Sequence, residues 1–216
     1  MRAIILAGGD QPDPRALSAA WPGWERADLV IGADGGARAA APLALPLHLI
    51  IGDFDTLTAS EVEEFAARGV RVEHLPREKD ATDTELALLT ALDAGATEIV
   101  ILGALGSSGG RSDHALGTIS LLAHPRARVV MLSLLDATSR IQLLVAPVRC
   151  SISARPGATI SLVPWGADAR VTTEGLRWPL RDELLTSGST RGLSNESLGD
   201  LTIELHEGAL LVSEGA

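Results

Sequence analysis

The chain has 216 residues, of which 46% are hydrophobic and 21% are charged, and its formal net charge is −10. This excess of acidic residues disfavours nucleic acid and anionic membranes as partners, because both bind basic surfaces. The apolar runs fall far short of the roughly 20 residues of a membrane span, and the N-terminal run is too short for a signal peptide, so we expect a cytoplasmic protein.

The first part of the sequence alternates short apolar runs with helical patterns. Strands are predicted over 3–7, 29–31, 47–51, 70–74, 98–102 and 129–132. Helices are predicted over 58–68, 83–94 and 113–122. This alternation is typical of a parallel sheet with helices on both faces. Ligands of such sheets bind beyond the carboxyl ends of the strands, where most of the glycine- and aspartate-rich segments lie.

The pattern changes after about residue 138, where helical periodicity fades. Short β-prone segments follow at 141–145, 159–163, 201–205 and 209–212, separated by turns rich in glycine. Many short strands with turn residues between them predict a small β-sandwich. We therefore expect two domains: an α/β domain over 1–137 and a smaller β-sandwich domain over 138–216.

Two aspartates, Asp53 and Asp55, follow the predicted strand 47–51. In extended chain they share a face, and two carboxylates about 6 Å apart repel by roughly 2–3 kcal/mol at an effective dielectric constant near 20. A Mg²⁺ ion shared with substrate phosphates would offset this repulsion. An isolated Asp-x-Asp is more often a solvated turn, but the position after a strand favours a ligand site.

A second polar cluster opens the predicted helix 83–94. It combines Lys79, the only lysine of the chain, with Asp80, Thr82 and Asp83. Thr82 matches the start of a capping box and Asp83 can compensate the helix dipole, so each residue has a structural explanation by itself. The combination within five positions favours an anion-binding role at the helix N-terminus.

A glycine-rich segment, Gly103 to His114, lies between a predicted strand and a helix. Its backbone can approach phosphates closely, and Arg111 can bind a phosphate through its planar fork. Asp113 is either a helix cap or a ligand contact. Near the C-terminus, Trp178 is either a core residue or a platform for a flat cationic ring, and the nearby Ser-Asn pair at 194–195 is either a turn or a contact.

Together these motifs resemble the thiamine pyrophosphokinases. The ordered set is Gly52-Asp-Phe-Asp-Thr56, Lys79-Asp-Ala-Thr-Asp83, Gly109-Gly-Arg-Ser-Asp-His114, Leu176-Arg-Trp-Pro-Leu180 and Leu193-Ser-Asn195. Each motif is weak alone, but their order and approximate spacing match from about residue 30 to the end. The change to a β-rich C-terminal region also matches the two-domain plan of that family.

The resemblance implies transfer of diphosphate from ATP to the hydroxyl of thiamine, giving thiamine diphosphate and AMP. It implies that Asp53, Asp55 and Asp83 are catalytic and hold Mg²⁺. It places at the nucleotide and diphosphate site Asp34, Lys79, Asp80, Thr82, Arg111 and Asp113. It assigns thiamine binding to Ser194 and Asn195, to which Trp178 is added as the stacking platform. It also implies a homodimer in which thiamine lies between the catalytic domain of one subunit and the β domain of the other.

Two other functions are compatible with parts of the pattern. The Asp-x-Asp after a strand also occurs in haloacid-dehalogenase-type phosphatases, although Leu57 here occupies the position of their threonine or valine. A non-catalytic regulator that binds nucleotide or thiamine could use the same scaffold, but binding alone would not require so many carboxylates. Phosphatase activity on simple esters would favour the first, and tight binding without turnover the second.

Overall fold

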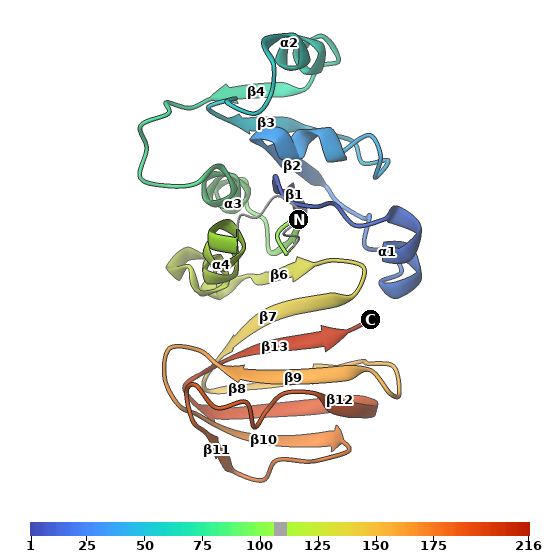
Figure 1. Ribbon diagram of the computed structural model, residues 1–216, viewed down its shortest axis with the longest axis vertical. Helices are drawn as coiled ribbons and strands as arrows, with labels where there is room; N and C mark the ends of the chain where they lie inside the picture. The colour runs from blue at the N-terminus through green and yellow to red at the C-terminus, as the bar shows by residue number, and fades with distance from the viewer. Residues whose placement is uncertain (106–111) are drawn as a thin grey trace. The chain divides into compact units, whose positions relative to one another are not determined.

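Figure 1 shows the computed structural model of the chain, which describes residues 1–105 and 112–216. The chain divides into two compact units, Met1–Ala137 and Thr138–Ala216. Each unit encloses a hydrophobic core of its own. Among the described residues, no helix combines the length and the apolar composition that a membrane crossing requires.

The first unit is built on parallel strands. Their order across the sheet is β6-β5-β1-β2-β3-β4, and every neighbouring pair is parallel. The strands are β1 (Arg2–Leu6), β2 (Leu29–Ala33), β3 (Leu49–Gly52), β4 (Arg71–His74), β5 (Glu98–Leu102) and β6 (Met131–Leu135). Each of the six predicted runs overlaps a strand, although the last strand begins at Met131 because Val129 ends the 3₁₀ helix before it. The prediction of a parallel α/β part is confirmed.

The central strands are buried on both faces of the sheet. In β1, the neighbouring residues Ile4 and Ile5 point to opposite faces, and both are fully buried. Helices must therefore cover both sides, and this explains why these strands are continuous apolar runs rather than alternating ones. The edge strand β4 is less buried and correspondingly more polar in sequence.

Helices connect these strands. They are α1 (Pro14–Ala20), η1 (Asp34–Ala39), α2 (Ala59–Ala67), α3 (Asp83–Asp93), α4 (Ser112–Ser120), η2 (Leu121–Ala123) and η3 (Pro125–Val129), where η denotes a 3₁₀ helix. The predicted helices 58–68, 83–94 and 113–122 correspond to α2, α3 and α4 with η2. The prediction lacks α1, because Leu17 is its only buried residue and one residue gives no periodicity.

Helix α3 brings its N-terminus to the carboxyl end of β3. Its buried residues Ala87, Leu88 and Ala91 place it on β1, β2 and β3. Thr82 caps the helix by accepting a hydrogen bond from a backbone N–H of the first turn. A Cβ atom added to Gly52, at the end of β3, would lie 3.3 Å from Cγ of Asp83. The cap therefore fixes Asp83 against the strand that precedes Asp53.

The second unit is antiparallel β structure. Its strands are β7 (Ser139–Val145), β8 (Val148–Ile152), β9 (Thr159–Pro164), β10 (Ala169–Leu176), β11 (Glu183–Leu185), β12 (Asn195–Glu207) and β13 (Ala209–Gly215). The start of β12 pairs with β9, and its later residues pair with β8 and β10, so one long strand belongs to two sheets. Alternate residues of β9 and β13 are buried in a common core. The predicted antiparallel β region is confirmed.

Candidate active site

A cavity of about 400 Å³ lies at the carboxyl ends of β1, β2, β3 and β5 and at the starts of α3 and α4. Four glycines lie in its described wall: Gly8, Gly9, Gly35 and Gly103. Without side chains, these residues let a ligand approach the backbone N–H groups closely. The position is the usual ligand crevice of an open α/β sheet.

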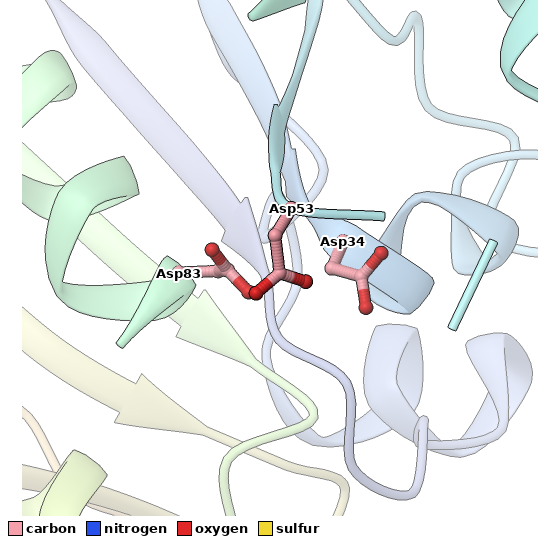
Figure 2. A group of neighbouring side chains, drawn as sticks. All are labelled: Asp34, Asp53 and Asp83. Carbon is pink, nitrogen blue, oxygen red and sulfur yellow. The ribbon is translucent and has the colours of Figure 1, made fainter. Parts of the chain in front are cut away.

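Three aspartates converge at this cavity. Asp34 opens η1 directly after β2, Asp53 follows β3, and Asp83 is the first residue of α3. Each offers a carboxylate oxygen, and these oxygens lie within 4.8 Å of one another. In Figure 2 the Asp83 side chain points toward Asp53, while the Asp34 carboxylate lies on the other side of Asp53 in this view. Residues 49 positions apart in sequence thus form one acidic group, which we call the aspartate triplet.

Asp34 is the most buried member of the triplet, with 7% of its surface exposed. Its backbone has φ 44°, in the left-handed region that few residues other than glycine adopt. Oδ2 accepts a hydrogen bond from the backbone N–H of Thr56 at 3.3 Å, but Oδ1 is buried with no hydrogen-bond partner in the described part of the chain. A buried unpartnered oxygen is costly, and a cation would satisfy it.

Lys79 is the cation next to the triplet. Its Nζ donates a hydrogen bond to Oδ2 of Asp53 at 2.7 Å and makes a charge contact of 3.1 Å with Oδ1 of Asp83. The hydrogen bond from Lys79 lowers the pKa of Asp53. Burial raises the pKa of Asp83 despite the lysine. Burial alone would lower the pKa of Lys79, but its contacts with the two aspartates outweigh this and raise it.

The triplet and Lys79 together fit a divalent cation. Three carboxylates against one ammonium leave a formal charge of −2. Oxygen donors of this kind suit hard ions such as Mg²⁺ and Mn²⁺. The unpartnered Oδ1 of Asp34 also supplies a ligand atom that no other described group uses. The residues present could therefore hold a metal ion at the triplet.

Asp55 lies apart from the triplet, although it lines the same cavity. The sequence predicted extended chain with Asp53 and Asp55 on one face, and this geometry is wrong. Phe54 has φ 54°, which turns the chain between the two aspartates. The exposed Asp55 carboxylate accepts a hydrogen bond from Oγ1 of Thr56 at 3.1 Å. Asp34, predicted only as a nucleotide-site residue, lies where Asp55 was expected.

The remaining residues predicted at the nucleotide site differ in whether they line the cavity. Thr82 lines the cavity and caps α3, whereas the exposed Asp80 is not part of the cavity lining. Asp113 is exposed in the first turn of α4, and Arg111 lies outside the described residues. Their roles at the nucleotide site stay predictions.

Two residues of α4 also line the cavity, and the sequence interpretation assigned no role to either. They are His114 and Thr118, and Oγ1 of Thr118 donates a hydrogen bond to the backbone carbonyl of His114 at 2.9 Å. Their spacing of four places them on one side of a helix. That spacing, combined with the expected position of the helix start, was the signal that could have identified them.

In the second unit, hydrogen bonds from Asn195, at the start of β12, hold the backbone of Trp178, which follows β10. Asn195 is 8% exposed, and its Nδ2 donates to the carbonyl of Trp178 at 2.7 Å. Its Oδ1 accepts from the backbone N–H groups of Trp178 and Glu196 at 3.1 and 2.9 Å. Trp178 itself is 51% exposed, with the guanidinium carbon of Arg177 5.2 Å from its ring centroid. Ser194 is also exposed. Asn195 thus holds the turn that presents Trp178.

Comparison with known proteins agrees with this two-part architecture. The family description "Thiamin pyrophosphokinase, catalytic domain" matches residues 21–133, and "Thiamin pyrophosphokinase, vitamin B1 binding domain" matches residues 148–210. Thiamine pyrophosphokinase of Bacillus subtilis is 32% identical over 195 residues, which cover 89% of this chain and 87% of the relative. Thiamine pyrophosphokinase 1 of Arabidopsis thaliana is 31% identical over 80% of this chain and 72% of its own length.

Comparison with solved structures also matches the chain to a thiamine pyrophosphokinase. The crystal structure of thiamine pyrophosphokinase from Bacillus subtilis superposes with a TM-score of 0.85 at 30% sequence identity, covering 100% of this chain and 99% of that chain. The matched regions include the aspartate triplet in the first unit and the Trp178 turn in the second. The chain belongs to the thiamin pyrophosphokinase family.

Proposed function

We propose that the chain is a thiamine diphosphokinase that uses the aspartate triplet, with Mg²⁺, to transfer diphosphate from ATP to thiamine. The observation that carries this proposal is the unpartnered Oδ1 of buried Asp34, which belongs to a group of formal charge −2 at a cavity lined in part by glycine. ATP is an anion, so a cation has to join it to these carboxylates. Membership of the family supplies the activity, and the named relatives supply the acceptor, thiamine.

The proposed reaction joins the hydroxyl oxygen of thiamine to the β-phosphorus of ATP. The bond from that phosphorus to the oxygen that bridges the α- and β-phosphates breaks, and AMP leaves with the bond's electron pair. Such transfers depend on positioning and charge neutralisation more than on covalent help from the protein. A bound Mg²⁺ would neutralise charge on the phosphate oxygens.

The residues around the ion position the reactants. Asp34, Asp53 and Asp83 would hold the metal, and Lys79 fixes two of these carboxylates by direct contact. The N-terminus of α3 and the glycine backbone of the cavity favour phosphate groups. We expect Thr82 to contact the nucleotide from that helix start. The predicted roles of Asp80, Asp113 and Arg111 at the same site remain part of the proposal.

Asp55 is proposed to accept the proton of the thiamine hydroxyl. It lines the cavity outside the metal-binding triplet, and no ion pair engages it among the described residues. A carboxylate in this position can act as a general base without losing a metal bond. Asp55→Asn should therefore lower kcat by a factor of about 100 or more and leave Mn²⁺ affinity near the wild-type value. Equal losses of kcat and Mn²⁺ affinity would instead place Asp55 among the metal ligands.

Thiamine is proposed to bind the turn that carries Trp178. The ring is half exposed and supplies a flat stacking surface, and the exposed Ser194 supplies a hydroxyl. Asn195 contributes by holding the turn, since its amide oxygen already accepts two backbone hydrogen bonds. We further propose a homodimer in which the second unit of one subunit serves the catalytic unit of its partner. A cytoplasmic location also stays a prediction.

Product analysis tests the proposed reaction directly. Incubation with ATP, Mg²⁺ and thiamine should give thiamine diphosphate and AMP in equal amounts, identified by mass. Asp53→Asn should abolish both products. ADP with thiamine monophosphate would contradict diphosphate transfer, and release of phosphate from p-nitrophenyl phosphate would favour the phosphatase alternative. Thiamine binding without turnover would favour the regulator.

A further inference from the structure

One arginine links η1, which carries Asp34, to the segment that follows β3 and to the start of α2. Arg38 lies on η1, four residues after Asp34. Its Nε donates to Oε1 of Glu61 at 2.6 Å, and its Nη2 donates to Oε2 of Glu61 at 2.8 Å. The same Nη2 also donates to the backbone carbonyl of Thr56 at 2.9 Å. A single guanidinium thus connects η1, the start of α2 and the segment between β3 and α2.

Thr56 is held from two sides by residues of η1. Arg38 donates a hydrogen bond to the backbone carbonyl of Thr56. The backbone N–H of Thr56 donates to Oδ2 of Asp34 at 3.3 Å. The approach is tight, because a Cβ atom added to Gly35 would lie 2.7 Å from Cγ2 of Thr56. Among the described residues, the Asp34 carboxylate accepts a hydrogen bond from Thr56 alone, and this leaves Oδ1 for a ligand. The orientation of that ligand atom therefore depends on where Thr56 lies.

Glu61 anchors the arginine to a rigid element. It completes the capping box of α2, in which its Oε2 accepts from the backbone N–H of Thr58 at 2.8 Å and Oγ1 of Thr58 accepts from the N–H of Glu61 at 3.3 Å. The hydrogen bond from Arg38, followed by those from Thr58, lowers the pKa of Glu61 to about 2. The bidentate geometry fixes both the distance and the plane of the guanidinium.

Building on the proposed metal site, we infer that Arg38 is a positioning residue for the divalent ion. It acts through Thr56 on the carboxylate of Asp34 and does not touch the ion. Because the Arg38 and Glu61 side chains are 47% and 31% exposed, their ion pair contributes little to folding stability. Partners that orient metal ligands nevertheless matter for the ion, and losing one typically weakens metal affinity by about 10- to 100-fold. Metal affinity and stability should therefore respond differently to loss of Arg38.

The test measures Mn²⁺ binding by electron paramagnetic resonance, without nucleotide, and thermal unfolding in EDTA. Arg38→Ala should bind Mn²⁺ at least about tenfold more weakly than the wild type. Its melting temperature in EDTA should change little. The matched control is Arg68→Ala, which removes the same charge from a looser pair on α2, where Nη2 lies 3.8 Å from Oε2 of Glu64. That control should bind Mn²⁺ like the wild type.

A conservative variant separates positioning from charge. Arg38→Lys keeps the positive charge but cannot form the bidentate contact, so it should recover only part of the lost affinity. If Arg38→Ala does not fold, Glu61→Gln provides the same comparison, because it weakens the partner while preserving its size. In turnover assays, the Mg²⁺ concentration required for half-maximal rate should rise in Arg38→Ala and in Glu61→Gln.

The outcomes distinguish this role from the proposed function. Wild-type Mn²⁺ affinity in Arg38→Ala would overturn the positioning role and leave the metal site intact. Equal weakening in Arg38→Ala and Arg68→Ala would also overturn it, because net charge alone would then explain the effect. A wild-type protein that binds no Mn²⁺ at the aspartate triplet would overturn the metal site and, with it, the role of Arg38.

Discussion

Replacing Asp34 with asparagine should stabilise the metal-free protein and abolish magnesium-dependent turnover. The carboxylate oxygens of the triplet lie within 4.8 Å of one another, and unit charges at that distance interact by about 3 kcal/mol at an effective dielectric constant near 20. Asp34 faces two carboxylates and the ammonium of Lys79, so its net repulsion is about that of one such pair. The weaker hydrogen bond to Thr56 offsets about 1 kcal/mol of the relief. The variant should therefore be more stable by about 2 kcal/mol.

Calorimetry in EDTA measures this gain. For a chain of this size, about 2 kcal/mol corresponds to a rise in Tm of roughly 4–8 °C. Added Mg²⁺ should raise the Tm of the wild type more than that of Asp34→Asn, because only the wild type retains all three ligands. The control is Asp55→Asn, which lies outside the triplet and should stay within about 0.5 kcal/mol of the wild type in EDTA. A lower Tm for Asp34→Asn in EDTA, or wild-type turnover in Mg²⁺, would refute the reasoning.

Three further outcomes follow from the contacts described above. Because hydrogen bonds from Arg38 and Thr58 lower the pKa of Glu61 to about 2 in the folded chain, the small stabilising effect that solvent screening leaves is complete above the usual value of 4.5 and is lost as the pH falls toward 2. Between pH 5 and pH 2, the free energy of unfolding in urea should therefore fall less for Glu61→Gln than for the wild type. An equal fall in both proteins would contradict this. Mixing Asp83→Asn with Trp178→Ala subunits should restore about a quarter of wild-type activity if the site is shared across a homodimer, since half of the randomly mixed dimers are mixed and each has one intact site. No recovery after verified exchange would place the site within one subunit. Asn195→Ala should destabilise the second unit by about 1 kcal/mol, because it leaves part-buried backbone groups of Trp178 unpaired, and no change in thermal unfolding would show that water replaces the amide.

The strands of the first unit were predictable because burial on both faces leaves a direct record in sequence. Ile99 and Ile101 in β5 are fully buried, and Val100 between them is 3% exposed. The run can only be a buried strand or part of a buried helix, and its length favours the strand. By contrast, β10 contains Gly175 at φ 79° and a register shift beside it, which interrupt the alternating pattern. Its pairing with β12 depends on tertiary contacts that no local pattern records.

The sequence predicted that the site is acidic but not which three aspartates form it. Asp53 was predicted as a metal residue because it follows a strand at the carboxyl edge of the sheet, and Asp83 was predicted through the resemblance to the thiamine pyrophosphokinases. The sequence could not show that Phe54 turns the chain away from extended geometry, because that turn depends on packing of Phe54 against His74 and the core near Ile50. It also could not show that η1 starts in a left-handed conformation, which brings Asp34 into the group.

The position of Lys79 has a practical consequence for chemical modification. The chain contains one lysine, so acylation of a lysine side chain reports on this position alone. An ammonium held by Asp53 and Asp83 is a poor nucleophile, since its pKa is raised and its proton is engaged. Activated esters at neutral pH should consequently leave Lys79 largely unlabelled as long as its contacts with Asp53 and Asp83 hold.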